Sequence, residues 1–171
     1  TGVFSDANVG TGKTVTITPS YSGADVSNYT VTDQSSTTAD ISAKALTATA
    51  SASNKTYDGG TTASTTLTFT GLVGTETLGQ TVGSTFDNKN VGSNKTVTVN
   101  SITLSDGSGL AANYSISAGQ TTTANITAKS LTVSGITASN KTYDGSTNAT
   151  LDASLVAYSG LVGGDTFEGT Y

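Results

Sequence analysis

Short stretches of this chain alternate polar and apolar residues, which is the pattern of a β-strand with one buried face. The clearest is KTVTITP at residues 13–19, and KTVTVNSITL at residues 95–104 is its counterpart. No window has an apolar period of 3.6 residues, and Gly, Asn and Asp interrupt the alternation at short intervals. Thr, Ser and Val also favour strands over helices. The pattern therefore predicts an all-β fold.

The alternating stretches belong to a sequence repeat of about 85 residues. The hexapeptide NKTYDG occurs at residues 54–59 and again at residues 140–145, an offset of 86. Further matches, with offsets of 82 to 89, are FSDANVGTGKTVTI from residue 4 with FDNKNVGSNKTVTV from 86, NYTV from 28 with NYSI from 113, ADISAKALT from 39 with ANITAKSLT from 124, and GLVGT from 71 with GLVGG from 160. Small changes in offset are expected because loops tolerate insertions better than strands do.

The repeat divides the chain into three parts. Residues 46–130 hold one complete repeat, the central repeat. Residues 1–45, the leading segment, are the C-terminal part of one repeat, and residues 131–171, the trailing segment, are the N-terminal part of the next. Written in front of residue 1, the end of the trailing segment aligns with residues 76–92 without a gap. We expect a segment of a longer tandem array, with identical repeats following head to tail.

The repeats are expected to join without a flexible linker. The stretch ADISAKALTATASAS, residues 39–53, has neither Gly nor Pro, and its apolar alternation changes phase between Ala45 and Leu46. A one-residue slip turns the buried face of a strand to the opposite side. We predict that the last strand of one repeat leads straight into the first strand of the next. The predicted junction residues are Lys44, Ala45, Leu46, Lys129, Ser130 and Leu131.

The size and strand pattern of each repeat predict an immunoglobulin-like β-sandwich. Extended, residues 39–53 would span about 50 Å at about 3.3 Å per residue. Such a junction is stiff, unlike a Gly/Ser tether, so tandem sandwiches joined in this way are expected to form a rod. A domain of this size buries only about 60% of the surface of its unfolded chain, and contacts with neighbouring repeats would add stability.

Composition narrows the possible function classes. The 171 residues carry a net charge of −5 with 11% charged residues, which favours neither a nucleic-acid partner nor a disordered acidic tail. No apolar run approaches the roughly 20 residues of a membrane span, so no membrane insertion is expected. Cys and His are both absent, which removes thiol chemistry, the commonest general base and the usual soft metal ligands. An enzyme is therefore not expected.

The ordered motifs resemble a known family. NKTYDGGTTAS, GLVGTETL, FDNKNVGSNKTVTV and NYSISAGQTTTANITAKSLT are similar to the YDG and MBG (mostly bacterial Ig-like) repeats of large bacterial surface proteins, including adhesins of the filamentous-haemagglutinin and biofilm types. The resemblance covers essentially the whole chain. It implies secretion to the cell surface and a stalk or fibre role in adhesion or aggregation. It implies no catalysis and supplies no catalytic residues.

The NKTYDG motif is interpreted as a repeated structural corner. Asp-Gly is a strong turn signal, and the tyrosine is expected to anchor the corner with a buried ring and a hydroxyl that reaches the backbone. A catalytic Lys-Tyr-Asp set is disfavoured, since neighbouring residues of a strand face opposite sides. The predicted structural motif residues are Tyr57, Asp58, Gly59, Tyr143, Asp144 and Gly145.

Four other features suggest chemistry. NVGTGKTVTI at residues 8–17 lacks the first Gly of a phosphate-binding loop and precedes a strand, so a hairpin turn is predicted. The loops around Asp25 and Asp106 make calcium a minority hypothesis, and no other cofactor is expected. Lys13 and Lys95 recur at equivalent strand starts, where a Lys–Asn cross-link is conceivable, but their alternation predicts exposed side chains, which disfavours it. Seven Asn-X-Ser/Thr sequons leave glycosylation open.

Together these patterns predict a structural stalk or filament segment of a secreted bacterial surface adhesin, located outside the cell. The expected partners are neighbouring identical repeats head to tail, with weak lateral contacts between fibres through low-charge, hydroxyl-rich faces. The alternative is a repeat module that binds a polysaccharide through exposed Tyr and Asn faces. An exposed aromatic platform in the same place on each repeat would favour this alternative.

Overall fold

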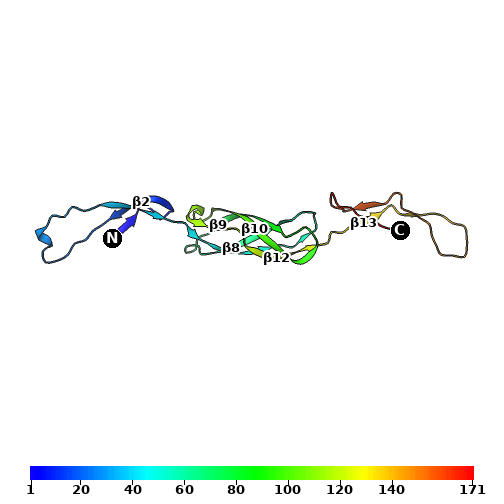
Figure 1. The fold of residues 1–171 in the computed structure, drawn as a ribbon, viewed down its shortest axis with the longest axis horizontal. Helices are drawn as coiled ribbons and strands as arrows, with labels where there is room; N and C mark the ends of the chain where they lie inside the picture. The colour runs from blue at the N-terminus through cyan, green and yellow to red at the C-terminus, as the bar shows by residue number, and fades with distance from the viewer. The chain divides into compact units, whose positions relative to one another are not determined.

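The computed structural model describes residues 1–171 and contains sixteen strands, two short 3₁₀ helices and no α-helix (Figure 1). The predicted all-β fold is therefore confirmed. The helices are too short to span a membrane. Two compact units are present, the first made of Thr1–Thr49, Leu67–Val82 and Ser101–Gly119, and the second of Ala50–Thr66, Gly83–Asn100 and Gln120–Tyr171.

Twelve of the sixteen strands lie wholly within one or the other of the two units. The first unit holds β1 (Gly2–Phe4), β2 (Gly10–Ile17), β3 (Ser36–Ile41), β4 (Lys44–Ala45), β11 (Tyr114–Ser115) and the helices η1 (Val26–Asn28) and η2 (Ala111–Asn113). The second holds β6 (Lys55–Thr56), β7 (Thr62–Ala63), β12 (Thr121–Thr127), β13 (Thr132–Ser134), β14 (Thr137–Ala138), β15 (Leu151–Asp152) and β16 (Ala157–Ser159). Four strands run from one unit into the other: β5 (Thr47–Ala52), β8 (Thr65–Thr70), β9 (Leu78–Phe86) and β10 (Gly92–Asp106).

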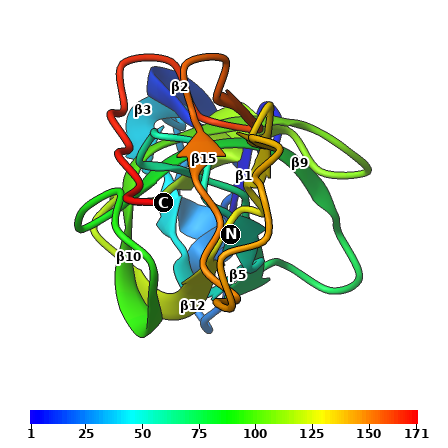
Figure 2. The same cartoon turned by 90° about the vertical axis from the view of Figure 1, so that its right-hand side faces the viewer.

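In the first unit, β2 is the middle strand of an antiparallel three-stranded sheet of order β1-β2-β3, and Figure 2 shows β2 beside β3. The predicted hairpin is confirmed, with its turn between β1 and β2. Strand β2 ends at Ile17, two residues before Pro19. Pro has no backbone N–H and does not continue a ladder. Its counterpart β10 meets no such residue and runs on to Asp106.

The central repeat contains a five-stranded sheet of order β6-β12-β10-β9-β7, in which β9, β10 and β12 lie alongside one another (Figure 1). In the second unit, β12 pairs antiparallel with β10 and parallel with β6. The core of that unit contains Ala63, Phe86, Val97, Ala124 and Ile126, with Ala52 and Tyr57 packed against it. These residues lie in β5, in β7 or between β6 and β7, and in the middle strands of the sheet. Because successive side chains of a strand point to opposite faces, they share one apolar face.

The sequence repeat is reproduced in the strand register. A β-bulge interrupts both the β2–β3 and the β10–β12 ladders at the same place. The equivalent pairs are Gly10 with Ile41 and Gly92 with Ile126, then Lys13 with Ala39 and Lys95 with Ala124. A bulge adds one residue to one strand and re-aims the side chains beside it. The two copies therefore share their local fold as well as their sequence.

The prediction that the last strand of one repeat leads straight into the first strand of the next is wrong. Strand β3 ends at Ile41 and β5 begins at Thr47, with only the two-residue β4 between them. At the second junction, β12 ends at Thr127 and β13 begins at Thr132. The change of phase at Ala45 and Leu46 explains the break, since a backbone that turns its apolar face over must leave the regular ladder.

Candidate functional site: the repeated turn and the repeat junctions

The NKTYDG motif forms a closed turn around its lysine. Lys55 Nζ donates to Asp58 Oδ1 at 2.7 Å and to the backbone oxygens of Gly60 at 2.8 Å and Thr62 at 3.2 Å. Asp58 Oδ1 also accepts from the N–H of Gly60 at 2.9 Å. Gly59 has a φ of 82°, a conformation that favours glycine. The lysine thus satisfies the carbonyl groups that the turn leaves unpaired.

The second copy of the motif repeats these contacts. Lys141 Nζ donates to Asp144 Oδ1 at 2.9 Å and to the backbone oxygen of Ser146 at 2.8 Å, and Gly145 has a φ of 71°. The Lys55 ammonium and the Gly60 N–H lower the pKa of Asp58. The Ser146 N–H and the Lys141 ammonium lower the pKa of Asp144. The Lys and Asp of both motifs are engaged within their own turns.

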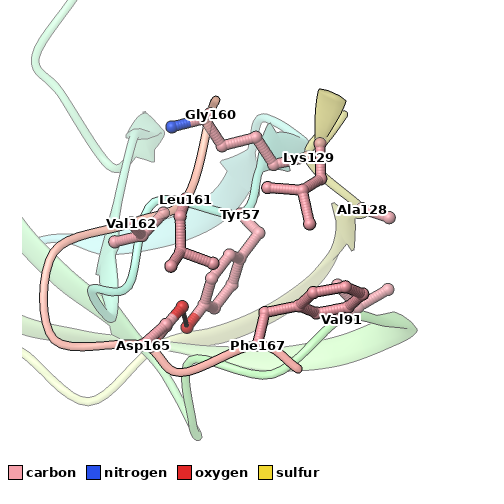
Figure 3. A pocket seen from close by; sticks show the side chains of 10 residues that line it. Tyr57, Val91, Ala128, Lys129, Gly160, Leu161, Val162, Asp165 and Phe167 are labelled. Carbon is pink, nitrogen blue, oxygen red and sulfur yellow. Dashed lines mark hydrogen bonds between the residues drawn. The ribbon is translucent and has the colours of Figure 1, made fainter. Parts of the chain in front are cut away.

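The two motif tyrosines differ in environment. Tyr57 is half-buried against the core, whereas Tyr143 is 94% exposed. The predicted burial is therefore wrong for Tyr143, since no part of this chain covers it. The hydroxyl of Tyr57 also reaches a side chain rather than the predicted backbone group. It donates to Asp165 Oδ2 at 2.7 Å (Figure 3).

Asp165 links the central repeat to the trailing segment within the second unit. Besides accepting from Tyr57, its carboxylate faces Lys89, whose Nζ lies 3.5 Å from Asp165 Oδ1. The Tyr57 hydroxyl and the Asp165 carboxylate raise the pKa of Lys89. A carboxylate that accepts from two side chains of the preceding repeat fixes the approach of the next one.

An open pocket of about 260 Å³ surrounds this contact. Its walls are largely apolar and come from both the central repeat and the trailing segment (Figure 3). The lining residues include Val91, Leu131, Leu161, Val162 and Phe167. Lys129 and Leu131, both predicted junction residues, line it together with Tyr57. The pocket is thus part of the junction.

Gly59 lies close to the trailing segment. A Cβ added to Gly59 would lie 2.8 Å from Val162 Cγ1, closer than real Cβ atoms approach a neighbour. The equivalent Gly145 has nothing within 4 Å of such a Cβ. The glycine of the turn therefore has two roles at the complete junction: it adopts positive φ, and it leaves room for the next repeat.

The leading junction, in the first unit, is made by backbone pairing. Lys44 and Ala45 of β4 pair in parallel with Tyr114 and Ser115 of β11. The next residue, Leu46, donates its N–H to the Ser115 oxygen at 2.8 Å and is buried. Ala45 remains exposed, so the predicted change of face between Ala45 and Leu46 is present. Strand β11 of the central repeat thus binds the chain that enters the repeat.

An asparagine closes the same junction. Asn113 Oδ1 accepts from the N–H of Val9 at 2.8 Å, and Asn113 Nδ2 donates to Asn8 Oδ1 at 3.0 Å. Both contacts join the central repeat to the leading segment. Together with the β4–β11 pairing they tie the two repeats at two separate points of the chain, which restricts rotation about a single link.

A second acid occupies the position equivalent to Asp165. Glu76 follows GLVG by two residues, as Asp165 does. The hydroxyl of the buried Tyr114 donates to the Glu76 carboxylate and accepts from the N–H of Val73 at 3.1 Å. The hydrogen bond to the Glu76 carboxylate raises the pKa of Tyr114. Sequence reasoning missed both acids, although the shared pattern of GLVG, one residue and then a carboxylate could have identified them.

The predicted exposure of Lys95 and Lys13 is wrong. The Lys95 side chain is 9% exposed, because it shares a strand face with Val97. Its Nζ lies 2.9 Å from Asp87 Oδ1 and donates to Asn88 Oδ1 at 2.7 Å. Lys13, 11% exposed, makes the corresponding ion pair with Asp6. The lysines thus close the turns that lead into β10 and β2.

The two loops considered for calcium show different contacts. Asp106 Oδ1 accepts from the N–H of Ala111, the first residue of η2, at 2.7 Å. Asp25 Oδ1 lies 3.5 Å from Asn28 Nδ2. No group of three or more acidic, His or Cys residues is assembled anywhere in the chain.

Comparison with known proteins identifies one family. The model of the YDG domain matches the chain three times, at residues 1–39, 42–124 and 127–170. Neither a curated protein nor a solved structure was found to match it. The three matches cover nearly the whole chain and agree with a tandem repeat.

Proposed function

Because the chain belongs to the YDG domain family, we propose that it is a structural stalk or filament segment of a secreted bacterial surface protein, acting in adhesion. YDG repeats are typical of large bacterial surface proteins. On this proposal the chain lies outside the cell, catalyses no reaction and contacts neighbouring identical repeats head to tail.

The observation that carries the proposal is the use of the repeated polar residues. Lys55 and Asp58 close their own turn, and Tyr57 binds Asp165 of the next repeat. A repeated motif whose polar groups hold turns and junctions serves the array itself. An active site would instead leave such groups available to act on a substrate.

We propose further that each complete repeat is an immunoglobulin-like sandwich and that successive repeats form a rod. Support comes from the five-stranded sheet of the central repeat, the two-stranded β5–β8 sheet and junctions without a linker. Each junction combines backbone pairing or an ion pair with side-chain hydrogen bonds, which favours a stiff connection over a flexible tether.

Immunogold electron microscopy of intact source cells tests location and form. Antibodies raised against the 171-residue chain should label surface stalks or extracellular filaments without permeabilisation. Antibodies against a cytoplasmic protein are the control. Label that appears only after permeabilisation would contradict an extracellular structural role.

A polysaccharide-binding module is the second candidate. Tyr21 and Tyr29 of the leading segment are 55% and 72% exposed and line an open pocket of about 340 Å³ with Val26 and Val31. Aromatic faces of this kind stack on sugar rings. The counterpart of Tyr29 in the central repeat, Tyr114, is buried, so this platform does not recur on each repeat. Retention of the chain on immobilised surface polysaccharide, lost in the double variant Tyr21→Ser and Tyr29→Ser, would support this candidate over the stalk.

A further inference from the structure

The five-stranded sheet of the central repeat has an outer face without charged side chains. Its core face carries Lys95, Val97 and Ile126, so the alternate positions of the same strands point outward. Within the second unit, every one of those outward positions is a threonine, an asparagine or a glycine. Six exposed or half-buried threonines make up the middle of this surface, here termed the threonine face: Thr62, Thr85, Thr96, Thr98, Thr121 and Thr123.

Four of these threonines lie on neighbouring strands. Thr62 of β7 opposes Thr85 of β9, and Thr98 of β10 opposes Thr121 of β12. Residues that oppose each other in a sheet point to the same side. Asn100 Nδ2 of β10 donates to Thr85 Oγ1 at 3.0 Å, so the side chains of β9 and β10 also meet on this face.

The leading sheet shows the register between β9 and β10. Val3 of β1 opposes Thr16 of β2 there, and the residues 82 positions later are Thr85 and Thr98. In both sheets, the residue two positions nearer the turn on the first strand donates its N–H to the oxygen of its partner at 2.9 Å. Thr85 therefore opposes Thr98, and one row of threonines crosses β7, β9, β10 and β12. At about 4.8 Å between strands, the row is about 14 Å long.

The hydroxyl pairs of this face recur in the leading sheet. Thr14 opposes Thr38 and Thr16 opposes Ser36, and all four residues are exposed. They occupy the positions of the Thr–Thr pairs between β10 and β12 of the central sheet. The one charged outward position of the leading sheet is Asp40, whose carboxylate accepts from a backbone N–H at 2.7 Å. The face is thus a property of the repeat.

Strand preference explains the threonines but not the missing charges. Soluble proteins usually carry charged residues at about 25–35% of their surface positions. In the second unit the charged side chains gather at turns instead, as in the pairs Lys55–Asp58 and Lys95–Asp87. A face without charge suits an uncharged partner, and the net charge of −5 disfavours acidic polymers.

Threonine side chains suit one class of uncharged partner. Each hydroxyl offers one donor and two acceptors, as a sugar hydroxyl does, and each methyl group can contact the C–H face of a sugar ring. The β-branched side chain has few rotamers, so little conformational entropy is lost on binding.

We propose that the threonine face binds single chains of an uncharged polysaccharide, laid along the row of Thr62, Thr85, Thr98 and Thr121. A row about 14 Å long accommodates a short oligosaccharide segment. This inference rests on the proposed location outside the cell and names a partner for the stalk. The site differs from the pocket of Tyr21 and Tyr29.

The size of the face argues against a second copy of the chain as the partner. Five strands about 4.8 Å apart and about 13 Å of each strand give roughly 300 Å². A stable protein interface buries about 800 Å² on each partner. A polymer that contacts the equivalent face of several repeats adds their contributions, so weak binding at each repeat suffices.

The twist of a sheet favours a flexible chain over a crystalline surface. Neighbouring strands are rotated by about 20–25°, so a row across four strands turns by about 60–75°. A flat crystal face contacts only part of such a row, whereas a single polysaccharide chain follows it.

Affinity electrophoresis of the full chain tests the binding. Native gels that contain increasing amounts of a soluble β-glucan, which is uncharged, should slow the chain relative to a reference protein. Gels that contain alginate, which is anionic, should not. The double variant Thr85→Val and Thr98→Val removes two neighbouring hydroxyls but keeps the β-branched shape and the strand preference. It should bind β-glucan at least fivefold more weakly.

The matched control is the double variant Thr66→Val and Thr68→Val. It also removes two hydroxyls from exposed strand positions, but these lie in β8, outside the threonine face. It should bind β-glucan as the unmodified chain does, and both double variants should keep the melting temperature of that chain.

Three results would overturn the inference. The first is no retardation by β-glucan, or an equal loss in the two Thr→Val double variants. The second is a loss confined to the Tyr21→Ser and Tyr29→Ser variant, which would place the binding in the aromatic pocket. The third is self-association in sedimentation velocity that Thr85→Val and Thr98→Val abolish, which would assign the face to a second copy. Surface labelling tests the proposed stalk independently of all three.

Discussion

The substitution Ile126→Ala tests whether the cluster of buried residues around Ile126 is the main source of the stability of the central repeat. Ile126 is 1% exposed, belongs to the core cluster and lies in β12, between β6 and β10 in the five-stranded sheet. The change removes three carbons, about 2.4 kcal/mol at about 0.8 kcal/mol per buried methylene. The remaining cavity raises the expected loss to about 3–4 kcal/mol, within the usual range for large-to-small core changes.

That loss is a large part of the stability of the repeat. An 85-residue unit at about 0.05–0.15 kcal/mol per residue is stable by about 4–13 kcal/mol. Each kcal/mol corresponds to about 4–8 °C for a domain of this size, so the melting temperature should fall by roughly 12 °C or more. Differential scanning calorimetry of the full chain at low concentration measures the change, because the central repeat contains all the buried hydrophobic residues.

The matched control is Leu110→Ala. It also removes three carbons, but Leu110 is 46% exposed and belongs to no core cluster. The melting temperature of the Leu110→Ala variant should fall by less than about a third of the fall expected for Ile126→Ala, since substitutions at exposed positions seldom lower the free energy of unfolding by more than about 0.5 kcal/mol. Equal shifts for the two variants, or a shift below about 4 °C for Ile126→Ala, would refute the assignment of the core.

Three further predictions concern the turns. Gly59→Ala should destabilise the chain more than Gly145→Ala, because both residues have positive φ but only Gly59 abuts the next repeat; equal melting temperatures would contradict this. The Lys95 ammonium lowers the pKa of Asp87, so this pair stabilises the fold above the ordinary carboxyl pKa of 3.8 and loses that effect as the pH falls below it; Asp87→Asn should flatten the acid side of the stability–pH curve. Intact-mass spectrometry should show no loss of about 17 Da, because Lys95 Nζ pairs with Asp87 and donates to the amide oxygen of Asn88 as a hydrogen bond, without a covalent bond to the amide carbon.

The fold class and the repeat could be predicted because both depend on the order of residues within short stretches of the sequence. Alternation fixes which face of β10 is buried, and Val97 and Val99 are indeed buried on one face. The prediction that alternation exposes Lys95 is wrong, because Lys95 has the same parity as Val97 and Val99 and lies on their inner face. The error arises because a carboxylate and an amide from the preceding turn satisfy the ammonium, and a residue-by-residue reading does not see those partners.

The junction chemistry was only partly predictable. The phase change located Leu46 and Leu131, but it could not show that Asn113 binds residues 8 and 9 or that Tyr57 binds Asp165. These contacts join residues about 100 positions apart, so no local pattern encodes them. Comparison of GLVGTE with GLVGGD would have identified Glu76 and Asp165, because a carboxylate present in both copies of a loop indicates that it binds a partner.

Small-angle X-ray scattering of the dilute 171-residue chain tests the central claim most directly, namely that successive repeats share one rod. The 15 residues of β10 span about 50 Å, so two repeat lengths give about 100 Å and a radius of gyration near 30 Å. A compact domain of this length would have a radius of gyration of about 15–16 Å. A value near 30 Å, with the distance distribution of a rod, is the predicted result. A value near 16 Å would show one globule and contradict the scaffold interpretation.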